Sequence, residues 1–200
     1  MPTAPEGRPS EARSRLLNTA TRLFYAEGIH SVGIDRIVAE AQVTRATLYR
    51  HFPGKEDLVL AYLNEVDRAM RGQADEAVTA GLPAAGTIRA LSESIAQGIQ
   101  SAGFRGCAFL NAAAEYPDPE SPVHKAVLAH REWFLDTVTE LLAKIQETGA
   151  EPAARHFVMM RDGAMAAGCL FDPVLICETF LHGVERLLTV YAATDYSDPA

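Results

Sequence analysis

The stretch that decides the fold is GIHSVGIDRIVAEAQVTRATLYRHFPGKEDL, which runs from Gly28 to Leu58. Apolar residues recur at helical spacing over 34–41 and again over 48–52. Thr44 is placed to cap the second segment, and Pro53-Gly54 ends it. Two short helices joined by a tight turn form a helix-turn-helix, which lays its second helix in the major groove of DNA. The pattern therefore predicts DNA binding by the helix that follows Thr44.

The outward residues of this second helix are polar or basic, as a groove-facing surface requires. Arg45 in the first turn can read a guanine through two hydrogen bonds, and the methyl groups of Ala46 and Thr47 can contact a thymine methyl. We expect Tyr49, His51 and Lys55 to hold phosphates. The expected DNA-binding residues are Ser31, Gly33, Arg36, Thr44, Arg45, Ala46, Thr47, Tyr49, His51 and Lys55. A solvated helix face without DNA has the same pattern, so the pattern alone leaves both interpretations open.

The rest of the chain is also typical of helices, with no strand-like alternation. Ser10 is a candidate N-cap for a helix that ends near Gly28, and a long helix begins near Lys55. Further helices are expected over about 88–99, 106–116, 122–149, 152–168 and 173–191. The sequence therefore predicts an all-α protein of about nine helices.

Composition excludes several protein classes. The chain has 200 residues, of which 48% are hydrophobic and 22% charged, so it has enough apolar surface to form a core. It has no run of apolar residues long enough to span a membrane, and its first ten residues lack the apolar segment of a secretory signal. Three cysteines cannot form a disulfide framework and fit a reducing cytoplasm.

The charge is distributed unevenly along the chain. The formal net charge is -8, but residues 1–51 hold seven Arg and five acidic residues, a balance of +2. Residues 52–200 hold the remaining eleven basic and twenty-one acidic residues, a balance of -10. Any contact with DNA is therefore expected to come from the N-terminal part.

Signals for an enzyme are weak. The six histidines are scattered, and none forms the His-x-x-x-His pair of a helical metal site. Neither a Gly-rich phosphate loop nor a nucleophile elbow is present. Cys107 follows Arg105-Gly106 at an expected helix start, but a buried inert thiol is the commoner case. We predict no catalytic residue, no metal site and no cofactor.

Two segments carry a family resemblance. Leu48-Tyr49-Arg50-His51-Phe52 and Lys55-Glu56-Asp57-Leu58 resemble the end of the recognition helix and the start of the fourth helix in TetR-family transcriptional repressors. The resemblance implies a three-helix DNA-binding domain with the helix-turn-helix at 10–55, followed by a larger helical effector-binding and dimerisation domain at 56–200. It also implies a cytoplasmic homodimer that binds a palindromic double-stranded DNA operator and is released by a small molecule, with no membrane partner. The alternative is a ligand-binding protein or enzyme on the same scaffold that does not bind DNA.

The chain departs from the family pattern at two places. The turn between the second and third helices usually contains Gly, and here it contains Gln42. A left-handed backbone at Gln42 would cost roughly 1–2 kcal/mol relative to Gly. Near the start of the second helix the family often has Thr, whereas this chain has Ser31-Val32-Gly33. The bare amide of Gly33 can still approach a phosphate.

The C-terminal part supplies candidates for a ligand pocket. Aromatic and aliphatic residues predominate, with Asn111, Glu115 and His130 as the expected polar anchors, so we expect a small, largely apolar effector. The expected ligand-binding residues are Phe104, Phe109, Asn111, Glu115, His130, Trp133, Phe134, Phe157, Met160 and Asp162. Plain core packing explains most such residues equally well.

The last two helices carry more apolar surface than one core-facing stripe requires, so they are the expected dimer interface. The expected contact residues are Phe157, Arg161, Ala164, Met165, Gly168, Phe180, Gly183, Val184 and Leu187. Two-fold pairing of this patch would place the two recognition helices about 34–36 Å apart, one turn of DNA.

Overall fold

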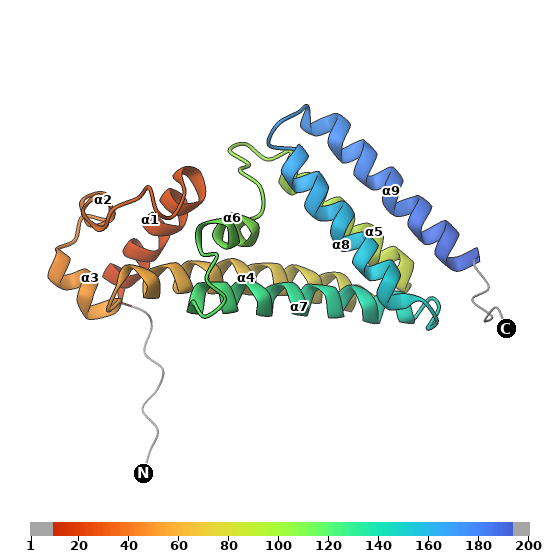
Figure 1. Ribbon diagram of the computed structural model, residues 1–200, viewed down its shortest axis with the longest axis horizontal. Coiled ribbons are helices and arrows are strands. Elements are labelled where there is room, and N and C mark those ends of the chain that lie inside the picture. Colours follow the sequence, from red (N-terminus) through yellow and green to blue (C-terminus); the bar gives the residue numbers. More distant parts are fainter. Residues whose placement is uncertain (1–9, 194–200) are drawn as a thin grey trace, which may run out of the picture.

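A computed structural model of the chain describes residues 10–193, and every regular element in that range is an α-helix. The nine helices confirm the prediction of an all-α protein (Figure 1). Their bounds are α1 Glu11–Glu27, α2 Ile34–Glu40, α3 Arg45–His51, α4 Lys55–Thr79, α5 Ala84–Ile99, α6 Ala108–Glu115, α7 Pro122–Ala143, α8 Ala150–Ala167 and α9 Pro173–Ala193.

The first three helices begin and end where their capping residues predict. The Ser10 side chain accepts a hydrogen bond from the Arg13 amide at the start of α1, and Thr44 accepts one from the Thr47 amide at the start of α3. Gly28 ends α1 at a φ of 91°. The turn between α2 and α3 holds Gln42 at a φ of 54°, the only positive φ of a non-glycine residue within 10–193. Gln42 therefore has the left-handed backbone that glycine adopts more easily.

The long helix α4 connects the N-terminal three helices to the rest of the molecule. It packs against α1 at one end and lies beside α7 along its length, while α8 and α9 form a layer at the far end with α5 (Figure 1). No helix within 10–193 is both long and apolar enough to cross a membrane.

The buried residues form two clusters. The first joins α1–α3 to the beginning of α4, α6 and the start of α7, and includes Leu16, Leu48 and Phe109. The second joins the end of α4 to α5, α7, α8 and α9, and includes Phe134, Phe157 and Val184. The first cluster extends across the domain boundary expected after residue 55, because Leu58, Tyr62 and other α4 residues complete it. Here "head" means α1–α3 and "body" means α4–α9.

Two helix bounds differ from the expectation in the second half of the chain. The helix expected to continue to Gly149 ends at Ala143, and α8 begins at Ala150 rather than at Pro152. Gly149 is the N-cap of α8 and has a φ of 81°, a left-handed conformation that glycine adopts without strain. Apolar spacing continues through Ile145 and conceals this turn from the sequence.

Candidate functional site

The exposed face of α3 is preorganised by its own cap. Thr44 Oγ1 lies 3.1 Å from the Thr47 amide nitrogen and 3.0 Å from Thr47 Oγ1, while Leu48 is fully buried beneath the helix. Thr44, Arg45, Ala46 and Arg50 are exposed on the other side. The short helix thus presents its first turn to solvent, where base edges would be contacted.

Arg45 is held in place by an acidic residue of α2. Its Nε donates to Asp35 Oδ1 at 2.6 Å, and Nη2 pairs with the other carboxylate oxygen. The hydrogen bonds that Arg45 donates to Asp35 raise the pKa of Arg45. A guanine would have to compete with this bidentate pair for the guanidinium, so Asp35 sets how readily Arg45 can reach a base.

Arg36 is engaged in the same way on the outer surface of α2. Its Nη2 donates to Glu27 at 2.7 Å and its Nε to Glu40 at 3.0 Å, and Glu40 also pairs with Arg22 of α1. The hydrogen bonds that Arg36 donates to Glu27 and Glu40 raise the pKa of Arg36. This network fixes α2 against α1, and it leaves Arg36 less free to bind phosphate than its sequence position indicates.

The expected phosphate ligands differ in their availability. Tyr49 is half exposed, whereas His51 Nε2 lies 3.1 Å from the hydroxyl of Ser10. Lys55 is partly buried with its Nζ 6.0 Å from the centre of the Phe24 ring, and this burial lowers the pKa of Lys55. Ser31 and Gly33 are exposed before α2, and Gly33 serves as its N-cap.

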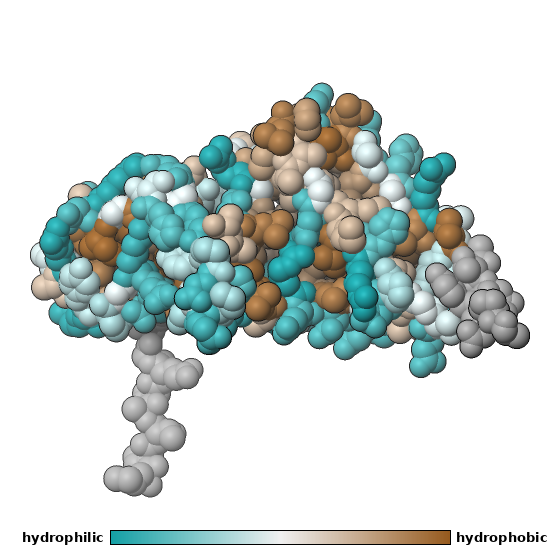
Figure 2. All heavy atoms as spheres, in the orientation of Figure 1, coloured by the Kyte–Doolittle hydropathy of each residue, from teal (hydrophilic) through white to brown (hydrophobic). Residues whose placement is uncertain are grey.

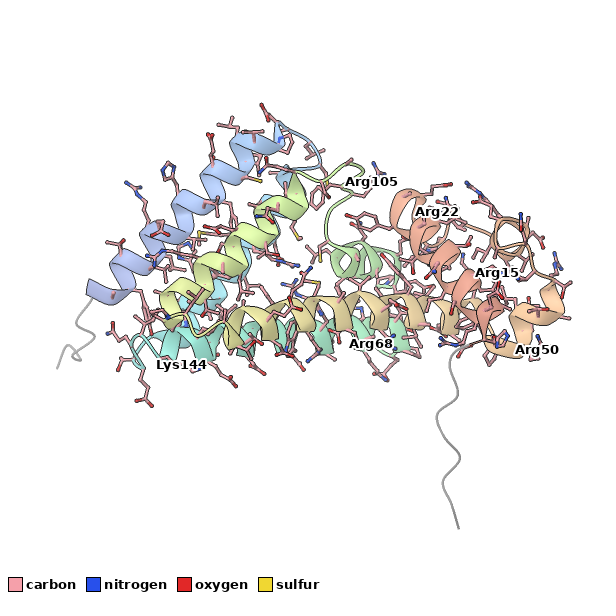
Figure 3. All side chains as sticks on the ribbon, turned by 180° about the vertical axis from the view of Figure 1, so that it is seen from behind. Arg15, Arg22, Arg50, Arg68, Arg105 and Lys144 are labelled. Carbon is pink, nitrogen blue, oxygen red and sulfur yellow. The ribbon has the colours of Figure 1, made fainter. Side chains whose placement is uncertain are left out.

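Arg50 is a basic residue that the predicted set of DNA contacts did not include. It is exposed on the last turn of α3 and has no acidic partner within residues 10–193. Figure 3 shows Arg50 at the outer end of the head, with Arg15 and Arg22 on α1. Its position five residues after Arg45, on a helix whose inner face is apolar, could have indicated from the sequence that Arg50 faces DNA.

Four of the ten residues expected to bind a ligand are buried in the protein core: Phe109, His130, Phe134 and Phe157. Phe109, Phe134 and Phe157 are almost fully buried, and His130 stacks on Phe109 with ring centres 3.5 Å apart. Burial lowers the pKa of His130, although a hydrogen bond of 2.7 Å to Asp67 opposes this effect. Trp133 lies under the guanidinium of Arg71 at 4.3 Å. These residues form a packed layer between α4, α6, α7 and α8.

Glu115, expected as a polar anchor for a ligand, instead connects the body to the head. Its two carboxylate oxygens accept hydrogen bonds from the amides of Ile29 and His30, at 2.7 and 2.5 Å. The neighbouring anchor Asn111 donates to the carbonyl oxygen of Arg105 at 2.8 Å. The end of α6 is therefore fastened to the turn between α1 and α2.

A cleft of about 400 Å³ lies where the head meets the body. Thr21, Arg22 and Tyr25 of α1 form one wall. The remaining lining residues are Tyr62, Val66, Met70, Gly98, Ser101, Phe104, Gly106, Cys107, Ala108, Arg161 and Met165. Of the ten residues expected to bind a ligand, Phe104 lines this cleft. Met160 lines a separate groove between α8 and α9, and Asp162 contacts Arg131 and Arg161.

The structure separates the expected dimer residues into two groups. Phe157, Arg161, Ala164, Phe180 and Val184 are buried within the single chain. Met165 lines the cleft, and Gly168 packs so closely on α5 that a Cβ atom there would lie 2.5 Å from Ile99. Gly183 and Leu187 remain partly exposed. Figure 2 shows apolar side chains gathered over the connection between α8 and α9, where Leu170, Phe171, Val174 and Leu175 are exposed.

Comparison with known proteins identifies the family. Residues 16–62 match the family model described as bacterial regulatory proteins, tetR family. The HTH-type transcriptional regulator LmrA of Bacillus subtilis is 31% identical over 166 residues, which cover 81% of this chain and 86% of LmrA. The chain belongs to the TetR family. A crystal structure of a TetR-family transcriptional regulator from Streptomyces coelicolor superimposes with a TM-score of 0.90 at 68% identity, covering 92% of this chain and 97% of that one.

Membership of the TetR family settles the broad function. The chain is a DNA-binding transcriptional regulator with a helix-turn-helix, and the regulators it resembles are not enzymes. The match over 16–62 contains the whole of α2 and α3 and the first part of α4. The surface of α3 described above therefore lies inside the segment that defines the family.

Proposed function

We propose that this TetR-family regulator is a homodimeric repressor that binds a palindromic DNA operator and releases it when a small, largely apolar molecule occupies the cleft. The observation that carries the proposal is the exposed first turn of α3, on which Thr44, Arg45 and Thr47 are held by a cap and an ion pair. Such a surface fits the major groove without rearrangement of the backbone.

Base contacts and phosphate contacts are assigned to different residues. Arg45 and Thr47 are proposed to read bases, because they lie in the first turn of α3. Tyr49, Arg50 and His51 follow on the same helix and are proposed to hold phosphates. Lys55 is proposed to do so as well, with its partly buried side chain as a fixed cation at the start of α4.

The proposed dimer face is the groove between α8 and α9. This groove has a volume of about 320 Å³ and is lined by small or apolar residues: Met160, Gly163, Ala164, Ala167, Ile176, Thr179, Phe180 and Gly183. A Cβ atom at Gly163 would meet no atom within 4 Å, so a helix of a second chain can approach closely. Pairing about a two-fold axis would bury the same groove on both chains and make the operator palindromic.

The cleft supports a mechanism of release. A ligand there would contact α1 of the head and α4, α5 and α8 of the body at once. The loop that forms another wall leads directly into α6, whose Glu115 holds the amides of Ile29 and His30. Filling the cleft is therefore proposed to turn each head relative to the body and to spoil the spacing of the two α3 helices.

The domain division proposed for this mechanism is a DNA-binding domain at 10–55 and an effector-binding and dimerisation domain at 56–200, of which 194–200 lie outside the described residues. The core shared by α1–α3 and the first half of α4 supports a head that moves together with that half of α4. Because the proposed partner is DNA, we place the protein in the cytoplasm.

The test is binding to DNA from the region upstream of the protein's own gene. Wild-type protein should retard this fragment at a concentration roughly tenfold or more below that needed for unrelated DNA of equal length. Arg45→Ala should lose the preference, whereas Arg155→Ala, a change of equal charge on the exposed side of α8, should keep it. Equal retardation of both fragments by the wild type would contradict the proposal.

A further inference from the structure

Arg161 of α8 is a buried cation whose hydrogen bonds are incomplete. Only 2% of its surface is exposed, and its Nε finds no hydrogen-bond partner within residues 10–193. Nη1 donates to Asp162 at 2.9 Å, and Nη2 lies 3.6 Å from the sulfur of Cys107. A thiol is a weak acceptor, so this guanidinium has one strong partner for five donors. Buried charged groups in proteins are normally paired far more completely.

The carboxylate that Arg161 contacts is shared with a second cation. Arg131 of α7 donates to the other oxygen of Asp162 at 2.6 Å. The nearby Asp67 is also occupied, because it accepts hydrogen bonds from His130 at 2.7 Å and from Arg71 at 2.6 Å.

The charges around this layer therefore do not balance. Arg71, Arg131 and Arg161 face two carboxylates, Asp67 and Asp162, and burial disfavours a proton on His130. These three cations exceed the two carboxylates by one charge, and Arg161 is the most buried of them, with 2% of its side chain exposed against 38% for Arg71 and 31% for Arg131. An uncompensated charge in the interior is unfavourable, and a ligand that supplies the missing anion would remove this penalty.

The space next to Arg161 has the composition expected for the rest of such a ligand. Tyr62, Val66 and Met70 of α4, with Phe104 and Met165, make most of the cleft wall apolar. At the head side, Arg22 also lines the cleft, but its charge is already paired with Glu40. Figure 3 shows Arg22 and Arg105 on the same upper side of the molecule, and the exposed Arg105 can attract an anion toward the opening.

We propose that the cleft binds a small amphipathic monocarboxylate, with the acid group on Arg161 and the hydrocarbon part against α4 and the loop before α6. This inference rests on the proposed function, because it names the chemical class of the effector. A planar carboxylate matches the forked donors of an arginine. A single negative charge balances the single excess positive charge. A neutral molecule would leave Arg161 with Asp162 as its one strong acceptor, and a cationic one would add to the excess of positive charge.

The experiment compares octanoate with octan-1-ol and octylamine, which share the hydrocarbon part and differ in the head group. Binding to the full chain is measured by titration calorimetry. Wild-type protein should bind octanoate roughly 10- to 100-fold more tightly than octan-1-ol, as expected for a hydrogen-bonded ion pair. Octylamine should bind most weakly. 2-Naphthoate against 2-naphthol repeats the comparison with an aromatic body.

Three variants test whether the preference for octanoate depends on Arg161 and the residues around it. Arg161→Gln should bring octanoate and octan-1-ol to within about threefold of each other, and Arg161→Lys should restore part of the preference. Arg131→Gln leaves Arg161 in place but frees Asp162 for it, so the preference should fall here too. This last variant keeps the proposal testable if Arg161→Gln does not fold. Arg155→Gln on the exposed side of α8 is the matched control and should behave as wild type.

The outcomes separate this inference from the proposed function. Equal binding of octanoate and octan-1-ol by wild type, or a preference that survives in a folded Arg161→Gln or Arg131→Gln protein, would overturn the inference. Release of operator DNA by a neutral compound would then still support the proposed function. A carboxylate preference that depends on Arg161, without release of operator DNA, would support the site and contradict the proposed effector role.

Discussion

Replacing Glu115 should loosen the connection between the head and the body. Its carboxylate receives the amides of Ile29 and His30 at 2.7 and 2.5 Å, and its side chain is 23% exposed. A hydrogen bond to a charged group contributes about 1.5–3 kcal/mol, and partial exposure to solvent brings each of these two bonds to the lower end of that range or below it, about 1–1.5 kcal/mol. Glu115→Ala loses both bonds, so local opening of this turn should become easier by about 2–3 kcal/mol. Glu115→Gln keeps one accepting oxygen and should lose about half of this.

The assay is native-state hydrogen exchange at the two amides. For Glu115→Ala, exchange at Ile29 and His30 should be roughly 30- to 150-fold faster, and for Glu115→Gln roughly 5- to 10-fold faster. Glu120→Ala is the control, because Glu120 lies beyond the end of α6, is exposed and pairs with Lys125. If both amides exchanged at the wild-type rate in a folded Glu115→Ala protein, the reasoning that α6 fastens the head would be refuted.

Four further predictions concern other parts of the molecule. Gln42→Gly should raise the free energy of unfolding by about 0.5–1 kcal/mol, because relief of the left-handed strain exceeds the entropy lost by Gly; an unchanged or lower melting temperature would count against this. Arg45→Ala should reduce discrimination between operator and mutated operator roughly 5- to 150-fold in competition binding, and unaltered discrimination would rule out a base contact. Gly163→Glu places a charge in the open groove of α8 and should give a folded monomer by ultracentrifugation, so a stable dimer would exclude this interface. Burial lowers the pKa of His130 below its value in the unfolded chain, so the unfolded chain binds more protons and the free energy of unfolding should fall as the pH drops below about 6.5. His130→Gln should flatten this pH dependence between about pH 7 and 5. An equally steep loss of stability in the variant would show that another group causes it.

The sequence predicted the helices and the head well because these depend on local signals. The caps at Ser10 and Thr44 and the glycine at 28 all act within a few residues of chain, and each has the predicted role. The break at Gly149 was predicted, but the end of α7 was placed there rather than at Ala143, because apolar spacing continues to Ile145.

The side-chain partners could not be predicted from the sequence, because they join residues far apart in the chain. The pairing of Arg45 with Asp35 follows from how α2 crosses α3, and the contact of Glu115 with Ile29 spans 86 positions. Arg161 was assigned to the dimer face from its helical spacing alone. In the structure it is buried beside Cys107 and Asp162, contacts that the spacing of residues along α8 does not show.

Selection of bound duplexes from a random DNA library, followed by sequencing, tests the central claim most directly, since it assumes nothing about the operator sequence. The account predicts an enriched palindrome whose half-site centres lie about 10–10.5 base pairs apart, or a multiple of that distance. It also predicts that Arg45→Ala enriches a degenerate site at the positions Arg45 reads. No enrichment with the wild-type protein, or a single asymmetric site that Arg45→Ala selects equally well, would contradict the account.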